Sequence, residues 1–202
     1  MRGLSYDTLG GLCAALREFI VDSVSQTGGH LASNLGIVEL AVALEREFDS
    51  SRDRIIYDVG HQCYVHKILT GRRDRFDTLR QYGGLCGFMK PEESITDPCI
   101  TGHASDSVSV ALGMAHARTL KNQKYHVVAV IGDGALTGGM AYEALNNAAE
   151  LKTNFIIIIN DNNMSISRNV GGMSTYLSAL RTAEVYTGMK LGVTKALKKV
   201  PK

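Results

Sequence analysis

Residues 126–165 read HVVAVIGDGALTGGMAYEALNNAAELKTNFIIIINDNNMS, and the expected fold follows from them. The stretch holds two short β-branched apolar runs, at 126–131 and 155–159, each typical of a buried parallel strand. Between them, residues 139–151 place apolar side chains at helical spacing. A strand, a helix and a second strand in this order form a right-handed parallel crossover. The sequence therefore predicts an α/β fold, with a parallel sheet flanked by helices on both faces.

The two strands of a parallel pair end at the same edge of the sheet, so GDG (132–134) and NDN (160–162) should meet there. A glycine-rich turn that leads into a helix favours phosphate, because free N–H groups and the helix dipole attract an anion. Asp133 would repel a phosphate unless a divalent cation lay between them. Mg²⁺ would take oxygens from Asp133, from the Asn162 amide and from a nearby backbone carbonyl. We therefore expect a metal–diphosphate ligand at this edge.

Two other phosphate-binding motifs do not fit the glycine spacing. The glycines at 132, 134, 138 and 139 do not form G-x-G-x-x-G, and no G-x-x-x-x-G-K-[ST] occurs in the chain. A GDG tripeptide alone is more often a tight turn after a strand. Its combination with NDN, at this spacing and on these elements, favours the metal–diphosphate site.

Length and composition indicate one domain, residues 1–202, of a soluble α/β protein. A net charge of +2 gives no broad basic field for nucleic acid, and the local excess LKKVPK at 197–202 is read as a solvated tail. No run approaches the ~18 apolar residues that span a bilayer, and no signal-peptide core follows the first residues. A cytoplasmic protein without a membrane partner is expected. The four cysteines form no C-x-x-C pair and are expected to be free thiols.

The remaining elements are predicted from apolar spacing. They are a strand at 54–60 and helices at 7–25, 36–47, 62–69 and 106–120. Segment 27–36 is expected to be a loop, and glycine-rich residues 82–105 a long functional or mobile loop. The cluster of Arg72, Arg73 and Arg75 could bind a phosphorylated substrate. Solvated arginines at a helix end are the favoured interpretation, so the cluster is left out of the site.

Three of the six histidines, His30, His61 and His103, directly follow a glycine. With 21 glycines in 202 residues, chance would place fewer than one there. Glycine lets a backbone approach a ligand closely, and His61 also follows a predicted strand end, where open α/β sheets bind ligands. A lone histidine in a loop is usually a surface or hydrogen-bonding residue. Their shared setting makes all three candidate site residues.

The pair GDG and NDN resembles the thiamine diphosphate signature of transketolase-like enzymes. This resemblance implies that Asp133, Asn162 and the carbonyl of Met164 hold Mg²⁺. It also implies that Gly134 and Ala135 supply backbone donors to the diphosphate of thiamine diphosphate.

Four longer segments sharpen the resemblance: GGHLASNLGIVEL, YDVGHQCYVHKILTGRRDRF, TGHASDSVSVALGMA and GDGALTGGMAYEALNNA. In this order they resemble the amino-terminal domain of the 1-deoxy-D-xylulose-5-phosphate synthases, and the match extends over about residues 4–167. The family implies a homodimeric transferase that condenses pyruvate with glyceraldehyde 3-phosphate, releasing CO₂, for isoprenoid, thiamine and pyridoxal synthesis. By this resemblance, His30 and His61 would be catalytic, and His61, Gly102, His103 and Ala104 would bind the cofactor.

Members of this family continue beyond such a domain, and their next domain supplies the glutamate that activates the cofactor. The chain here ends in an amphipathic basic pattern at 189–202 and holds no candidate for that glutamate. A fragment of a longer enzyme, inactive alone, is the preferred interpretation, and a split subunit with its mate on another chain is the alternative. The amino-terminal subunit of a split transketolase and a non-catalytic dimerisation or regulatory module also remain open.

Overall fold

The computed structural model describes residues 3–151, 153–161 and 179. Two compact units divide the chain, residues 1–164 and residues 165–202. The helices and strands named here belong to the first unit. Asn162, Met164 and the basic pattern at 189–202 lie outside the described residues.

Three parallel strands form the sheet in the order β1, β2, β3. They are β1 (Arg54–Tyr57), β2 (Val127–Gly132) and β3 (Ile156–Asn160). They confirm the three predicted strands, although β1 is shorter than the predicted 54–60. The strand ends early because Val59 and Gly60 have positive φ angles of 60° and 80°, which an extended strand does not contain.

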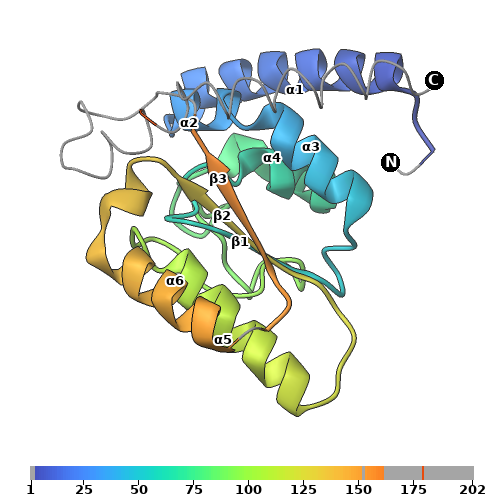
Figure 1. The fold of residues 1–202 in the computed structure, drawn as a ribbon. Coiled ribbons are helices and arrows are strands. Elements are labelled where there is room, and N and C mark those ends of the chain that lie inside the picture. Colours follow the sequence, from blue (N-terminus) through green and yellow to red (C-terminus); the bar gives the residue numbers. More distant parts are fainter. Residues whose placement is uncertain (1–2, 152, 162–178, 180–202) are drawn as a thin grey trace. The chain divides into compact units, whose positions relative to one another are not determined.

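Helices cover both faces of the sheet, which confirms the predicted fold class (Figure 1). On one side lie α1 (Tyr6–Thr27), α2 (Leu31–Leu35), α3 (Val38–Glu47) and α4 (Tyr64–Lys67), and on the other α5 (Ser107–Leu120) and α6 (Gly139–Leu151). The irregular turns are η1 (Ile68–Arg72), η2 (Arg73–Thr78) and η3 (Ala135–Thr137). The helices predicted at 7–25, 36–47, 106–120 and 139–151 are therefore confirmed to within about two residues.

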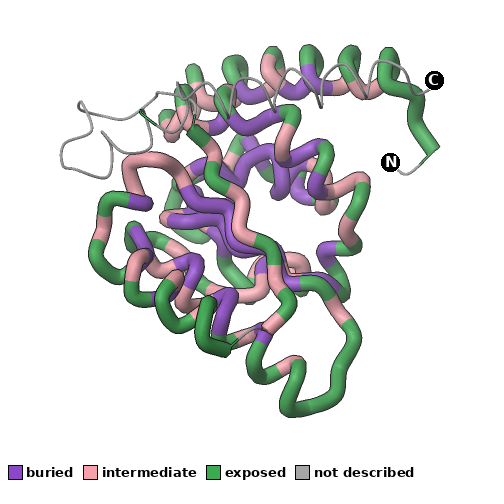
Figure 2. The backbone as a smooth tube through the Cα atoms, viewed as in Figure 1, coloured by how far each residue is buried: buried purple, intermediate pink, exposed green. Residues whose placement is uncertain are grey.

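The core lies against β1 and β2, which are buried along almost their whole length (Figure 2). Side chains alternate between the faces of a strand. Ile55, Tyr57, Val128 and Val130 join α1, α3 and α4 in one hydrophobic cluster. Full burial of such an aliphatic side chain stabilises the fold by roughly 1.5–3 kcal/mol. This burial fixes the positions of the strand ends that carry the candidate site.

Two local predictions need correction. Residues 31–35 form the short helix α2 inside the segment 27–36 that was expected to be a loop. Side-chain bonds from Asn34 hold this single turn, since its amide donates to the carbonyls of His30 (2.6 Å) and His61 (2.8 Å). The helix predicted at 62–69 is regular only over α4 and then passes into η1, which contains the left-handed Gly71 with a φ of 92°. Helix α2 is a single turn held partly by a distant residue, so no periodic apolar pattern in the sequence predicts it.

The free thiols and the loop character of residues 82–105 agree with the sequence-based expectations. All four cysteines are free, and segment 82–105 contains no helix or strand. Among the described residues, no helix has both the length and the apolar character needed to cross a membrane.

Gly60 generates a prediction about stability. A Cβ atom at Gly60 would collide with the side chain of Thr101, and its φ of 80° disfavours any other residue. We expect Gly60→Ala to lower the free energy of unfolding by about 2–3 kcal/mol, measured by chemical denaturation. Gly10→Ala is the matched control, because Gly10 lies in open space inside α1, where alanine should add about 0.5–1 kcal/mol. Equal effects of the two changes would contradict this reading of Gly60.

Candidate active site at the carboxyl edge of the sheet

The register of β2 and β3 brings their carboxyl ends together. Gly132 is paired with Asn160 at the end of the ladder, so Asp133 and Asp161, the next residue of each chain segment, both follow a strand at this edge. This is the common edge that the spacing of GDG and NDN predicts. No group of three or more His, Cys, Asp or Glu side chains suited to a metal occurs in the described part of the chain. The predicted triad needs only one such side chain, Asp133, besides an amide and a carbonyl.

The turn after β2 is held by a second loop. Gly134 leads into η3, and the chain then passes through Gly138 into α6. The hydroxyl of Ser105 donates to the carbonyl of Ala135 at 2.6 Å. A Cβ atom at Gly138 would collide with the Ser105 side chain, so the two loops approach as closely as their backbones allow. Residues 102–104 therefore directly precede Ser105, the residue that contacts the predicted diphosphate turn.

Asp58 ties this loop to the end of β1. Its carboxylate is buried and accepts the backbone N–H groups of Ser105 (2.9 Å) and Ser107 (3.1 Å). Its own N–H donates to the carbonyl of Val130 at 2.8 Å. Sequence reasoning did not select Asp58. The available signal was an acidic residue placed between an apolar strand and a Gly-His pair.

Two of the three Gly-His pairs meet in the structure. The rings of His30 and His61 lie edge to face, with centroids 5.6 Å apart. The His30 ring also contacts Phe88, at a centroid distance of 5.6 Å. Its backbone N–H donates to the Tyr64 hydroxyl at 3.3 Å, and its Nδ1 lies 3.4 Å from the same oxygen. Segments some thirty residues apart thus hold two imidazoles at one point.

Burial controls the charge of these imidazoles. Burial lowers the pKa of His30, and the nearby Arg80 guanidinium lowers it further. Burial also lowers the pKa of His61, and His30 adds to that effect while Asp58 opposes it. Both rings are therefore neutral at neutral pH. Within the described part of the chain, the buried Nδ1 of His61 has no hydrogen-bond partner, so it can serve a bound ligand.

His103 occupies a different position. It follows Gly102, whose φ is 153°, and its side chain is exposed. Its loop is fixed two residues later, at Ser105. The structure therefore brings His30 and His61 into contact, and it places His103 on the neighbouring loop that covers the turn after β2.

The arginine cluster after α4 requires a correction. Arg73 and Arg75 are exposed, as expected for solvated arginines. Arg72 is buried, and its guanidinium donates to both carboxylate oxygens of Asp97, at 2.7 and 2.8 Å. The expectation that all three are solvated is wrong because the partner of Arg72 lies 25 residues further along the chain.

Comparison with known proteins agrees with this geometry. The family model described as 1-deoxy-D-xylulose-5-phosphate synthase matches residues 1–202. Curated proteins with that name from Clostridium kluyveri, Clostridium tetani and Caldanaerobacter subterraneus are 57%, 59% and 58% identical to the whole chain over 201 residues. The chain spans 32% of the length of each of these relatives.

A solved structure shares the fold. Transketolase from Leishmania mexicana superposes with a TM-score of 0.67 over 84% of this chain and 30% of its own, at 22% sequence identity. At that identity the likeness concerns the fold alone. The sequence relatives are far closer, and the likeness to this solved structure agrees with the parallel sheet and its flanking helices. The chain therefore belongs to the 1-deoxy-D-xylulose-5-phosphate synthase family.

Proposed function

We propose that this chain forms the diphosphate- and Mg²⁺-binding part of a thiamine diphosphate-dependent synthase. The reaction condenses pyruvate with glyceraldehyde 3-phosphate and yields 1-deoxy-D-xylulose 5-phosphate and CO₂. The observation that carries the proposal is the meeting of the β2 and β3 ends at one sheet edge, in a chain of this family. The contact between His30 and His61 supports their role as a proposed catalytic pair.

Asp133, Asn162 and the Met164 carbonyl would hold the Mg²⁺ ion. The position of Asp133 directly after β2, at the same sheet edge as Asp161, supports this role. Gly134 and Ala135 would offer backbone N–H groups to the diphosphate, because they form the turn between β2 and α6. A divalent ion between the Asp133 carboxylate and the phosphates removes their mutual repulsion.

The bound cofactor supplies the nucleophilic carbon and the electron sink that decarboxylation of pyruvate requires. The protein orients the substrates and stabilises developing charge. His30 and His61 would donate hydrogen bonds or protons to the oxygen that becomes negative. Their lowered pKa values keep both rings neutral, so each can donate from one nitrogen and accept at the other. Gly102, His103 and Ala104 would line the cofactor beside the turn that Ser105 contacts.

The proposal includes a cytoplasmic homodimer and further domains, either on the same polypeptide or on a second chain. These domains would complete the cofactor cleft, and the 202-residue chain alone would not turn over. A split transketolase is the nearest enzymatic alternative, and a non-catalytic dimerisation or regulatory module is the other. Identity of 57–59% to curated synthases, against 22% to a transketolase, favours the synthase.

The activity itself is the first test. We expect the complete protein that contains this chain to release CO₂ from pyruvate and to form 1-deoxy-D-xylulose 5-phosphate only when glyceraldehyde 3-phosphate, thiamine diphosphate and Mg²⁺ are all present. Product mass spectrometry would show it. Two-carbon transfer from a ketose phosphate without pyruvate would favour the transketolase instead. Pyruvate decarboxylation by the isolated 202-residue chain would contradict the need for further domains.

The metal site gives a second prediction. Asp133→Ala should weaken Mg²⁺-dependent binding of thiamine diphosphate by at least ~100-fold, because a metal ligand and its charge are lost. Calorimetric titration of the complete protein measures this. Asp161→Asn is the matched control, since Asp161 leaves the same sheet edge but is not in the predicted ligand set. Unchanged affinity in Asp133→Ala would remove Asp133 from the site.

The Arg80 charge gives a third prediction. Replacing Arg80 with glutamine removes a positive charge that lowers the pKa of His30, so that pKa should rise. Protonation then begins at a higher pH, and the acid limb of kcat/KM should move to higher pH with it. Ring-proton NMR titration reports the pKa directly. Arg73→Gln is the control, because Arg73 is an exposed arginine stacked on Phe19. An unchanged His30 titration in Arg80→Gln would show that Arg80 does not act on His30.

A further inference from the structure

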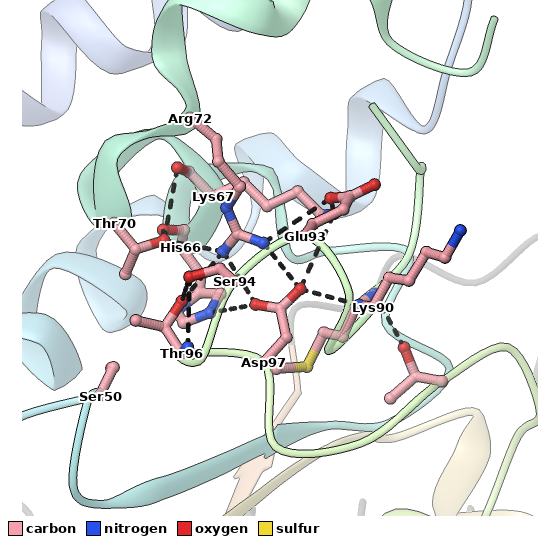
Figure 3. Close-up of polar contacts among 12 residues, drawn as sticks. Ser50, His66, Lys67, Thr70, Arg72, Lys90, Glu93, Ser94, Thr96 and Asp97 are labelled. Carbon is pink, nitrogen blue, oxygen red and sulfur yellow. Dashed lines mark hydrogen bonds and ion pairs between the residues drawn. The ribbon is translucent and has the colours of Figure 1, made fainter. Parts of the chain in front are cut away.

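A cluster of six charged side chains lies in the first unit, apart from the predicted site residues, and Figure 3 shows the part of it around Asp97. Three are bases and three are carboxylates: His66, Lys67, Arg72, Glu45, Glu93 and Asp97. The side chains are between 0% and 8% exposed. The cluster is electrically balanced when His66 is protonated, and nothing in the proposed reaction uses it.

Asp97 is the centre of this cluster. Its carboxylate accepts bonds from His66 Nε2 at 3.0 Å and from both terminal nitrogens of Arg72. It also accepts the backbone N–H of Lys90 at 2.8 Å. The other ring nitrogen of His66 lies 2.6 Å from Glu45. Asp97 therefore joins the end of α4 and the turn η1 to a segment of the 82–105 loop.

A second carboxylate makes a parallel connection. Glu93 accepts the Lys67 ammonium at 2.6 Å and the backbone N–H of Cys86 at 2.6 Å. Two backbone donors, at 86 and at 90, are thus held by two buried carboxylates. We call residues 86–90 the strap.

The strap carries a side chain of the candidate site. Phe88 lies at its midpoint, two residues from each anchored amide, and its ring contacts that of His30. At the next residue after Phe88, the backbone N–H of Met89 donates to the Thr101 hydroxyl at 3.1 Å. Thr101 is the residue against which Gly60 packs. The strap is therefore fixed at three points around the aromatic ring that touches a proposed catalytic histidine.

A contribution to stability does not by itself explain why such a charged cluster is buried. Removing charges from water costs free energy, and apolar residues of similar volume often stabilise a fold as well or better. What charged bonds add is direction, because each carboxylate oxygen must face its donor. Burial opposes the charged form of His66, but the bonds to Asp97 and Glu45 outweigh it and raise the pKa of His66. Burial also opposes the charged form of Asp97, but His66, Arg72 and the Lys90 amide outweigh it and lower the pKa of Asp97. These bonds thus favour the charged forms of both groups.

We propose that Asp97 is a positioning residue for the active site: it fixes the strap so that Phe88 holds the His30 ring in its working orientation. The inference rests on the proposed function, in which His30 acts on the substrate. Helix α4 connects the two ends of the arrangement, since Tyr64 contacts His30 and His66 contacts Asp97. Release of the strap would free the His30 ring on its Phe88 side while Asp133 and the turn after β2 stay in place.

The test uses Asp97→Asn, Phe88→Leu and the double variant in the complete protein. In Asp97→Asn we expect amide hydrogen exchange in the strap to become at least ~10-fold faster and kcat to fall by about tenfold. Thiamine diphosphate affinity should stay within about threefold, because the predicted ligand set is untouched. Phe88→Leu should reproduce much of the loss in kcat. The double variant should be no slower than Asp97→Asn, since both changes act through one contact.

Several outcomes would overturn the inference. If the two losses in kcat multiply in the double variant, Asp97 acts independently of Phe88. Faster strap exchange with unchanged kcat would show that the strap does not serve the site, and an equal fall in cofactor affinity would indicate general loosening. Glu39→Gln is the control: it breaks a similar two-oxygen contact with Arg17, between α1 and α3, and should change none of these quantities.

Two further measurements keep the test decisive. If Asp97→Asn does not fold, Glu93→Gln takes its place, with the same direction of change in strap exchange and kcat, and no change in either would overturn the inference. Strap exchange and the NMR titration of His30 need no turnover. If the complete protein does not catalyse the proposed condensation, these two readouts still decide the positioning role: an altered His30 titration in Asp97→Asn supports it, and an unaltered one overturns it.

Discussion

The parallel pairing of three strands is the constraint on which the structure depends. Because β1, β2 and β3 run in one direction, their carboxyl ends open onto one edge, and each end is followed by polar groups: Asp58, Asp133 and Asp161. The buried strands β1 and β2 hold these ends in place. Asp58 then attaches a further loop to this edge, since its carboxylate fixes the loop that contacts the turn after β2. The proposed site is therefore assembled by the sheet.

Much of this could be predicted from sequence because the relevant signals are local. The β-branched runs at 126–131 and 155–159 and the helical spacing at 139–151 lie within short windows, and the crossover rule places GDG and NDN at a common edge. The Gly-His pattern drew attention to His30 and His61, whose rings meet in the structure. It could not show which pairs touch, because His103 carries the same local pattern and lies exposed on another loop.

The features that sequence reasoning missed depend on partners far apart in the chain. Arg72 reads as a solvated arginine until Asp97 is placed beside it. Helix α2 is one turn long and is held by Asn34, whose side chain bonds to the carbonyl of His61 as well as to that of His30. Asp58 looks like an ordinary residue after a strand until Ser105 and Ser107 turn their N–H groups toward it. Tertiary proximity decides each case, and no window of a dozen residues contains it.

Val59 connects Asp58 to the proposed catalytic pair at an energetic cost. A β-branched residue with a φ of 60° is rare and strained, and Val59 stands between Asp58 and Gly60, just before His61. Bonds on both sides hold it there: Asp58 through the two serine amides and Gly60 through its packing on Thr101. Loss of either anchor would remove one of the contacts that hold Val59 in this conformation, two residues before His61. The geometry around this histidine is thus a property of the cooperatively folded unit, and it exists only when loops from three regions of the sequence are in place together.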